Sequence, residues 1–309
     1  MSEDITEALS KQMNGELEGK IEESETDTAR LRRILKESVS FKEWADSLSH
    51  DFMNILTVIS GYAELAHYCP ETASKYYGLT KEYTLSAVSL IRQYLSKTDS
   101  VQAKASLLHT LNNTLTPILG GAELGMKPSE RRKDIHAQIF AGLEKAVSLI
   151  TELQVFANAD VPGVMQPVRT THVIETVLMQ YINPKVRIHK KYEEGSNYVP
   201  ATEPELARVY KSLIKNAVEA GADCIYTQVY RKSETICASI LDNGCGITEE
   251  AITRIFEPFY TTKFQNLGLG LATSKKIIEK YGGRIIFESH PREGSIFTVE
   301  LPACEKKDS

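Results

Sequence analysis

The sequence lacks the features that mark several large classes of protein. Its 309 residues include only five cysteines, and none of them form a Cys-x-x-Cys pair. This excludes a disulfide framework or a thiolate zinc site as the organising feature. No uninterrupted apolar run approaches the roughly 20 residues that a membrane helix requires. With 36 Lys and Arg against 41 Asp and Glu, the formal charge of −5 creates no general attraction to nucleic acid or anionic lipid.

The composition that remains, 42% hydrophobic and 25% charged, is typical of a globular protein long enough for two domains. The first residues have neither the basic region nor the apolar stretch of a signal peptide. We therefore expect a cytoplasmic protein with no membrane span and no nucleic-acid partner. Residues 1–28 carry nine acidic side chains against two lysines, which predicts an acidic flexible tail.

The segment from residue 30 to about residue 158 is predicted to be helical, because apolar residues recur at intervals of three and four. Breaks near Pro70, Asp99 and Pro128 divide it into four helices. The predicted helices span roughly 30–68, 72–97, 101–126 and 129–157. A linker is expected over Asp160–Pro167, which contains two prolines and a glycine.

An internal repeat organises this helical half. Residues 47–65 align with residues 106–124 at an offset of 59, and 11 of the 19 positions are identical. The same offset superposes residues 87–91 on residues 146–150, where all five positions agree. The polar identities include His50 with His109 and Asn54 with Asn113. Amphipathic periodicity alone does not reproduce polar residues, so a helical hairpin has been duplicated.

Beyond the linker the pattern changes to short β-rich runs that alternate with helical stretches. The expected strands lie at 186–192, 224–230, 235–241, 284–288 and 296–301. The expected helices lie at about 171–182, 203–220 and 269–281. An α+β half therefore follows an all-helical half.

The C-terminal half also holds four short motifs in a fixed order. They are the amphipathic helix 206–220 with Asn216 and Glu219, the turn Asp242–Ile247, the stretch Phe256–Lys263, and the segment Gly268-Leu-Gly270 that opens a helix. Each motif alone is common in unrelated proteins. Together, in this order and spacing, they resemble the ATP-binding domain of sensor histidine kinases in the GHKL superfamily.

This resemblance implies ATP and Mg²⁺ as ligands. Asn216 would bind Mg²⁺ through its amide oxygen, which suits a hard cation. Asp242 would accept a hydrogen bond from the adenine amino group, and Glu219 and Lys263 complete the predicted polar contacts.

The glycines have separate implied roles. Gly244 and Gly246 would let the backbone pass close to the base, where a side chain would collide. Gly268 and Gly270 would lie at a helix N-terminus, where free N–H groups and the helix dipole favour phosphate. Phe256 and Phe259 are expected to pack the base of the lid rather than touch the nucleotide.

The sequence departs from the family pattern at two places. Hydrolytic relatives carry a glutamate four residues before the Mg²⁺-binding asparagine, where this chain has Ser212; this argues against a chaperone-type ATPase. Between Lys263 and Gly268 only four residues remain, with Asn266 where the kinases usually have glycine. The lid is therefore shortened, which favours the alternative of a scaffold whose ATP domain has degenerated.

The helical half resembles the matching dimerisation and histidine-phosphotransfer domain, present twice. In the first copy His50 is followed by Asp51, a base that can hold one ring N–H while the other nitrogen attacks. Asn54, one turn on, could orient a water for dephosphorylation.

The second copy keeps His109 and Asn113 but has Thr110, a poor base, after the histidine. Spacing points the other way, because His109 lies 216 − 109 = 107 residues before Asn216, as is usual in the family, and His50 lies 166 before it. The phosphoacceptor is assigned to His50 on the acid–base argument.

The sequence thus predicts an acidic tail (1–28), two helical hairpins (29–99 and 100–159) that form a four-helix bundle, and an α+β sandwich ATP domain (166–303). The predicted function is a soluble two-component histidine kinase that passes its phosphoryl group to an aspartate of a response-regulator receiver domain. The alternative is a non-catalytic phosphotransfer or scaffold protein. A separate sensory partner is possible, and the bundle predicts an intramolecular pseudo-dimer, with a homodimer as the other assembly.

Overall fold

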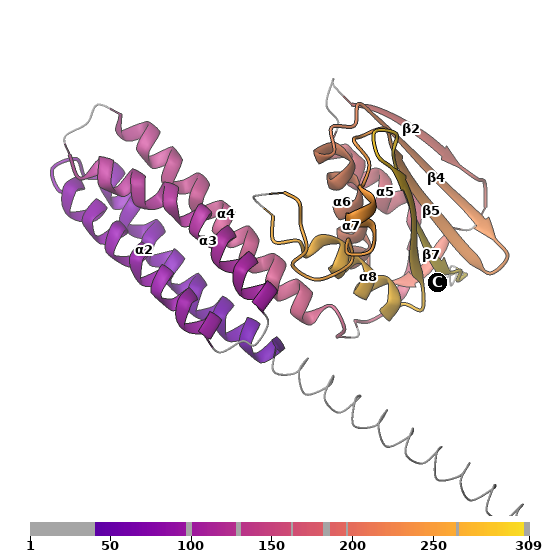
Figure 1. The fold of residues 1–309 in the computed structure, drawn as a ribbon, viewed down its shortest axis with the longest axis horizontal. Coiled ribbons are helices and arrows are strands. Elements are labelled where there is room, and N and C mark those ends of the chain that lie inside the picture. The colour runs from indigo at the N-terminus through magenta and orange to yellow at the C-terminus, as the bar shows by residue number, and fades with distance from the viewer. Residues whose placement is uncertain are drawn as a thin grey trace, which may run out of the picture.

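The computed structural model describes residues 41–96, 101–127, 131–161, 163–181, 186–195, 197–263 and 266–305, with backbone only at 101–104. The predicted acidic tail lies outside these residues. A long helical bundle is joined at one end to an α/β domain (Figure 1). Within the described residues no helix is long and apolar enough to cross a membrane.

The bundle consists of four antiparallel helices from this one chain. The first helix covers residues 41–68, and it is followed by α2 (Ala73–Ser96), α3 (Val101–Gly125) and α4 (Arg132–Asn158). These bounds confirm the predicted helices to within three residues wherever the structure describes them. The prediction that the first helix begins at residue 30 concerns residues outside the described range.

One apolar stripe of each helix forms the bundle core. Its fully buried members include Phe52, Ile59, Tyr77, Ile91, Leu111, Leu115, Ile118, Ile139 and Ile150. Burial of a side chain of this size stabilises the fold by about 1.5–3 kcal/mol. All four helices contribute to this one core, so each hairpin buries its apolar face against the other hairpin of the same molecule.

Five strands form the main sheet of the C-terminal domain. They are β2 (Arg187–Tyr192), β4 (Cys224–Lys232), β5 (Thr235–Asp242), β7 (Gly294–Pro302) and β6 (Arg284–His290), in that spatial order. The β2–β4 pair is parallel, and the other three pairs are antiparallel. All five were predicted from their β-rich composition.

Three helices cover one face of this sheet, on the side of the bundle (Figure 1). They are α5 (Thr170–Met179), α6 (Glu203–Glu219) and α8 (Gly270–Lys280), and the short α7 (Glu249–Ile252) follows β5. At the start of α6 the Thr202 hydroxyl donates to the Glu205 carboxylate at 2.9 Å, which stabilises the first turn. The helix layer and the sheet enclose one core, so this half is a two-layer sandwich.

The expected linker is shorter than predicted. Gln166 and Pro167 belong to β1 (Gln166–Arg169), which pairs with β3 (Tyr198–Ala201) as a separate two-stranded sheet. Each strand has only four residues, too few to show the alternation of apolar and polar residues that identifies a strand in the sequence. Pro167 is tolerated because a two-stranded sheet leaves one edge of each strand without a ladder partner. The linker prediction was therefore wrong at its C-terminal end.

The α/β domain packs on the end of the bundle through an aromatic contact. The Phe259 ring centroid lies 6.3 Å from that of Phe41 in the first helix and 6.2 Å from that of Phe156 in α4. The Lys276 ammonium lies 4.6 Å from the Phe156 ring centroid and pairs with Asp160 at 2.7 Å. Phe259 was predicted to pack the base of the lid, and it also joins the two domains.

Candidate functional site

Asp242 is the last residue of β5, the central strand of the five-stranded sheet, and is only 5% exposed. One of its carboxylate oxygens accepts the Gly244 N–H at 2.8 Å. Burial raises the pKa of Asp242, and the backbone hydrogen bonds from Gly244 and Ser295 and the charge of Lys263 oppose that rise. A carboxylate fixed in this way is a directional acceptor.

The two glycines after Asp242 are required by close contacts. A Cβ on Gly244 would lie 2.7 Å from the Ala220 Cβ and 2.9 Å from an Asp242 carboxylate oxygen. Gly246 has a φ of +68°, and its Cβ would lie 2.1 Å from the His290 carbonyl oxygen. A side chain at either position would collide with the protein's own atoms, so the turn itself requires both glycines. Their approach to the base stays a prediction.

Asn243 is a structural residue of this turn that the sequence reasoning missed. Its side-chain oxygen accepts the N–H groups of Asp223 and Cys224 at 3.1 and 3.0 Å, and its amide nitrogen donates to Asp223 at 2.6 Å. The turn after β5 is thereby tied to the start of β4. An Asn beside Asp and Gly is a common turn residue, so the motif alone did not single it out.

Gly268 and Gly270 lie where the lid enters α8. Gly268 has a φ of +71°, and its Cβ would lie 2.3 Å from the Tyr260 carbonyl oxygen. Gly270 begins α8, and its Cβ would lie 2.8 Å from the Ser212 hydroxyl oxygen of α6. These contacts exclude a side chain at either glycine. The N-terminus of α8 stays the predicted position of the phosphates.

The base of the lid is held to α6 by a charged cluster. The Lys263 ammonium donates to the Glu219 carboxylate at 2.7 Å, and the Asn266 amide donates to the same oxygen at 3.1 Å. Burial would raise the pKa of Glu219, but Lys263, Lys215 and Asn266 outweigh it and hold the pKa low. The predicted residues Glu219 and Lys263 are therefore brought together, and Asn266 joins them.

Asn216 lies on the same helix as Glu219 and is partly exposed. This helix faces the bundle. Burial raises the pKa of Glu152 in α4, while Lys215 lowers it and Glu219 raises it further. Lys215 and Glu219 of α6 therefore lie close enough to Glu152 of α4 to act on its charge.

The first histidine box lies on the exposed face of the first helix. The His50 side chain is 76% exposed, and its Nδ1 lies 3.3 Å from Asp51 Oδ1. Asn54 Nδ2 lies 3.4 Å from the same Nδ1. The other Asp51 oxygen accepts the Tyr94 hydroxyl of α2 at 2.7 Å. Nε2 is the ring nitrogen left for chemistry.

The second histidine box is arranged differently. Asn113 Nδ2 lies 3.1 Å from Nε2 of His109, and Thr110 is 2% exposed, within the bundle. Three residues before His109, the Ser106 hydroxyl approaches the Leu267 carbonyl of the lid at 3.4 Å. The docked α/β domain therefore places its lid one helical turn from the second histidine.

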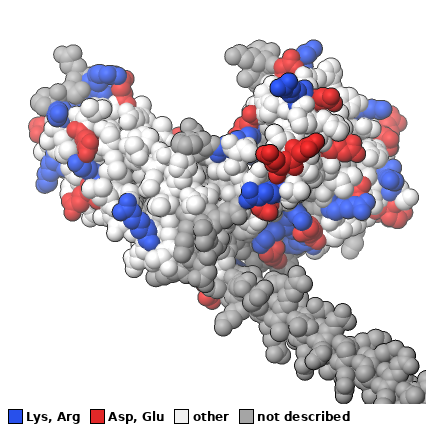
Figure 2. Space-filling view, in the orientation of Figure 1, with Lys and Arg blue, Asp and Glu red and all other residues white. Residues whose placement is uncertain are grey.

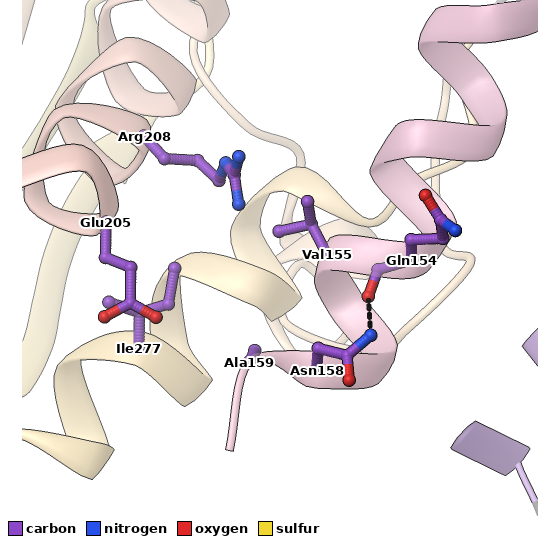
Figure 3. Close-up of a pocket in the computed structure, with 7 residues that line it drawn as sticks. All are labelled: Gln154, Val155, Asn158, Ala159, Glu205, Arg208 and Ile277. Atoms are coloured by element: carbon purple, nitrogen blue, oxygen red, sulfur yellow. Dashed lines mark hydrogen bonds between the residues drawn. The ribbon is translucent and has the colours of Figure 1, made fainter. Parts of the chain in front are cut away.

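A cavity of about 350 Å³ lies where α4 meets α6 and α8 (Figure 3). It is lined by Gln154, Val155, Asn158, Ala159, Glu205, Arg208 and Ile277, none of them a predicted nucleotide residue. Asn158 donates to the Gln154 carbonyl at 2.9 Å. On the face in Figure 2, acidic and basic side chains are interspersed over the α/β domain, with no broad patch of one sign.

Comparison with known proteins identifies the class of the C-terminal domain. Residues 201–305 match the family described as "Histidine kinase-, DNA gyrase B-, and HSP90-like ATPase". This range contains every predicted nucleotide residue from Asn216 to Gly270. The C-terminal domain belongs to this ATP-binding family.

The curated relatives are named as sporulation kinases and sensor histidine kinases. Sporulation kinase A of Bacillus subtilis (strain 168) is 32% identical over 208 residues, which cover 65% of this chain and 34% of the relative. The sensory histidine kinase/phosphatase NtrB of Azospirillum brasilense is 31% identical over 229 residues, 67% of this chain and 57% of NtrB. The chain is a homologue of sensor histidine kinases, and it spans between a third and three fifths of the length of these two relatives.

Solved structures share the fold. Histidine kinase ThkA, in a complex with response regulator protein TrrA, superposes with a TM-score of 0.53 at 24% identity, over 71% of this chain and 65% of that chain. Full-length ShkA in complex with AMPPNP gives a TM-score of 0.51 at 21% identity, over 73% of this chain and 46% of ShkA. The order of a helical region and an α/β sandwich is therefore that of histidine kinases.

Proposed function

We propose that this protein is an ATP-dependent protein histidine kinase. The observation that carries the proposal is the packing in one molecule of an intact nucleotide turn around Asp242 and a bundle with two exposed histidine boxes. Phosphoryl transfer requires little covalent chemistry from the protein beyond position and charge, and these are the parts that supply them.

ATP fits the residues present. Asp242 is a fixed acceptor for the adenine amino group, and Gly244 and Gly246 would let the backbone pass close to the base. Gly270 opens α8 for the phosphates, next to the Lys263–Glu219 pair. Asn216 would hold Mg²⁺, whose charge would offset that of the phosphates.

In the proposed reaction a histidine Nε2 lone pair attacks the γ-phosphorus, and the bond to the bridging oxygen breaks with its electron pair on ADP. The ring becomes positively charged as the N–P bond forms. At His50 the Asp51 carboxylate, 3.3 Å from Nδ1, stabilises that charge and holds the Nδ1–H. This argument assigns the acceptor role to His50, and Asn54, one turn on, would orient a water for dephosphorylation.

The position of the α/β domain in this structure opposes the assignment to His50, because its lid lies nearer the second histidine. The lid contacts Ser106 of the second hairpin, one turn from His109, while Phe41 is the contact with the first helix. For His50 to be phosphorylated, the α/β domain must leave this position and approach the first hairpin. The segment between Asp160 and β1 is short, so the movement is a rotation of the domain about its attachment to α4.

The phosphoryl group is then passed to an aspartate of a response-regulator receiver domain. The relative ThkA has been crystallised with such a regulator, which supports this class of partner. A separate sensory protein would supply the signal. The shared core of the four helices supports a monomeric pseudo-dimer, and light scattering at micromolar concentration tests it against a homodimer.

Incubation with γ-labelled ATP and Mg²⁺ tests the proposal. We expect a label on the protein that is acid-labile and base-stable, as a phosphoramidate is. Asn216→Ala should weaken Mg²⁺-ATP much more than metal-free ATP, and Asp242→Ala should weaken both and also ADP. If calorimetry detects no adenine nucleotide binding to the wild-type protein, the kinase proposal fails and the non-catalytic scaffold replaces it.

A further inference from the structure

A tyrosine from the neighbouring helix holds the acid beside His50. The Tyr94 hydroxyl of α2 donates to Asp51 Oδ2 at 2.7 Å, while Asp51 Oδ1 lies 3.3 Å from His50 Nδ1. The carboxylate is therefore held at both oxygens. Rotation of Asp51 about its side-chain bonds would break one of these contacts, so Tyr94 determines which way Oδ1 points.

Tyr94 is itself held in place. The Trp44 indole of the first helix donates to the Tyr94 carbonyl at 2.9 Å, which fixes the backbone at this level of α2. The hydrogen bond to Asp51 raises the pKa of Tyr94, and burial adds to the rise. The hydroxyl stays protonated across the physiological range and remains a donor.

Two side chains near His50 Nδ1 favour opposite protonation states of that nitrogen. Asp51 accepts a proton from Nδ1, whereas Asn54 Nδ2, at 3.4 Å, can donate to it. If Nδ1 carries the proton, Nε2 has the free lone pair that attack on phosphorus requires. If Nδ1 accepts from Asn54, the proton moves to Nε2 and the ring cannot attack.

Comparison of the two hairpins shows that packing at the position of Tyr94 does not require a hydroxyl group. At the offset of 59, Asp51 corresponds to Thr110 and Tyr94 corresponds to Leu153. Leu153 is fully buried, so an apolar residue fills this position without a hydroxyl. The acid and its hydrogen-bond donor occur together in the first hairpin, and both differ in the second.

We propose that Tyr94 is a positioning residue for phosphoryl transfer at His50. It orients Asp51 so that Nδ1 keeps its proton and Nε2 is free. This inference rests on the proposed kinase function for its kinetic consequence, and on geometry alone for its effect on the His50 tautomer.

The test is Tyr94→Phe in the full-length protein. Nitrogen-15 NMR of the imidazole rings at neutral pH should show a shift of His50 from the Nδ1–H toward the Nε2–H tautomer. Labelling by ATP should slow by about 10- to 150-fold, with the KM for ATP unchanged, because the loss of one charge-assisted hydrogen bond is on this scale. A purely structural role of Tyr94 would not change the tautomer.

Tyr83→Phe is the matched control. It removes a hydroxyl from the same helix, where the Tyr83 ring packs 5.5 Å from that of Tyr62. This variant should keep the wild-type tautomer and labelling rate. Equal effects of the two substitutions would overturn the proposal.

A double-mutant cycle guards against misfolding of the single variant. If Tyr94 acts through Asp51, then Tyr94→Phe should cost nothing further in an Asp51→Asn background. Additive losses would overturn the proposal, as would a wild-type tautomer in Tyr94→Phe. If the wild-type protein takes no label at all, the kinase function fails, and the tautomer measurement still decides the role of Tyr94.

Discussion

The two helical hairpins are copies in sequence, but they surround their histidines differently. In the first hairpin His50 contacts Asp51, which accepts from Tyr94. In the second, the amide of Asn113 approaches Nε2 of His109, and the residue after the histidine is buried. Duplication preserved the histidine and the amide, whereas the acid and its support are present in one copy. The difference indicates that the copies have taken different roles.

The interiors of the two hairpins also differ. Tyr62 and Tyr83 face each other between the first two helices, with ring centroids 5.5 Å apart. Their counterparts at the offset of 59 are Gly121 and Gly142, which lie against isoleucines of the facing helices. Aromatic rings fill a space in the first hairpin that close backbone approach removes in the second. A larger side chain is therefore accommodated at these two positions in the first hairpin and excluded at the corresponding positions of the second.

The largest expected effect separates the two histidines. His50→Gln should abolish the acid-labile label, and His109→Gln should leave it, because Asp51 lies 3.3 Å from His50 Nδ1, whereas a threonine follows His109 in the sequence. The measurement is labelling by γ-labelled ATP at equal protein concentration. Loss of the label in His109→Gln alone would show that proximity of the lid to Ser106 outweighs local chemistry.

The next effect tests the acid directly. Asp51→Asn should slow labelling by about 10²- to 10⁴-fold, the usual cost of removing a positioned base. Nucleotide affinity should be unchanged, since Asp51 lies on the first helix and the nucleotide residues on the other domain. The reciprocal variant Thr110→Asp, in a His50→Gln background, should restore part of the label at His109. An unchanged labelling rate in Asp51→Asn would show that the acid gives the first histidine no advantage over the second.

A stability comparison tests the packing difference. A Cβ at Gly142 would lie 2.6 Å from Ile118 Cγ1 and 3.3 Å from the Thr114 carbonyl oxygen, so Gly142→Ala should cost about 1–2 kcal/mol. Nothing lies within 4 Å of a Cβ at Gly61, and Gly61→Ala should stabilise the helix by up to about 1 kcal/mol. Urea unfolding of both variants measures the two changes. Equal changes would show that Ile118 does not crowd position 142 in the folded protein.

The smallest effect concerns pH. Burial lowers the pKa of His136, and His67 lowers it further, against the opposing charge of Glu64. The two histidine rings lie 4.3 Å apart, across the contact between the first helix and α4. The unfolded chain therefore binds more protons, so the stability of the bundle should fall as the pH drops below about 6.5, the unfolded pKa of histidine.

His136→Phe should reduce this pH dependence. Its counterpart in the first hairpin is Tyr77, a ring that does not gain charge in this range, so an aromatic residue suits the position. The measurement is the Tm of wild-type and variant between pH 7.5 and 5.5. The same slope in both proteins would assign the pH effect to other groups.

Local pattern was sufficient for most of the fold. The helices of the bundle and the five strands of the main sheet were predicted because each is long enough to show its own period. The pair β1–β3 was missed, since four-residue strands show no period and Pro167 suggested a linker. The nucleotide glycines were predicted from motif order. At Gly244 and Gly268 the protein's own atoms leave no room for a side chain, and the roles of these glycines toward a nucleotide stay predictions. The contacts of Asn243 and Tyr94 were not foreseen, because their partners lie 20 and 43 residues away.

The sequence by itself determined the duplication, the boundaries of the long helices and the class of the C-terminal domain. These depend on residues close together in the chain or on fixed motif spacing. Only the tertiary structure decided that the lid lies against Ser106, that Phe259 joins the two domains, and that Tyr94 supports Asp51. Such contacts arise when helix faces meet across the bundle, and a hydrophobic period specifies which face is buried but not which side chains come opposite each other.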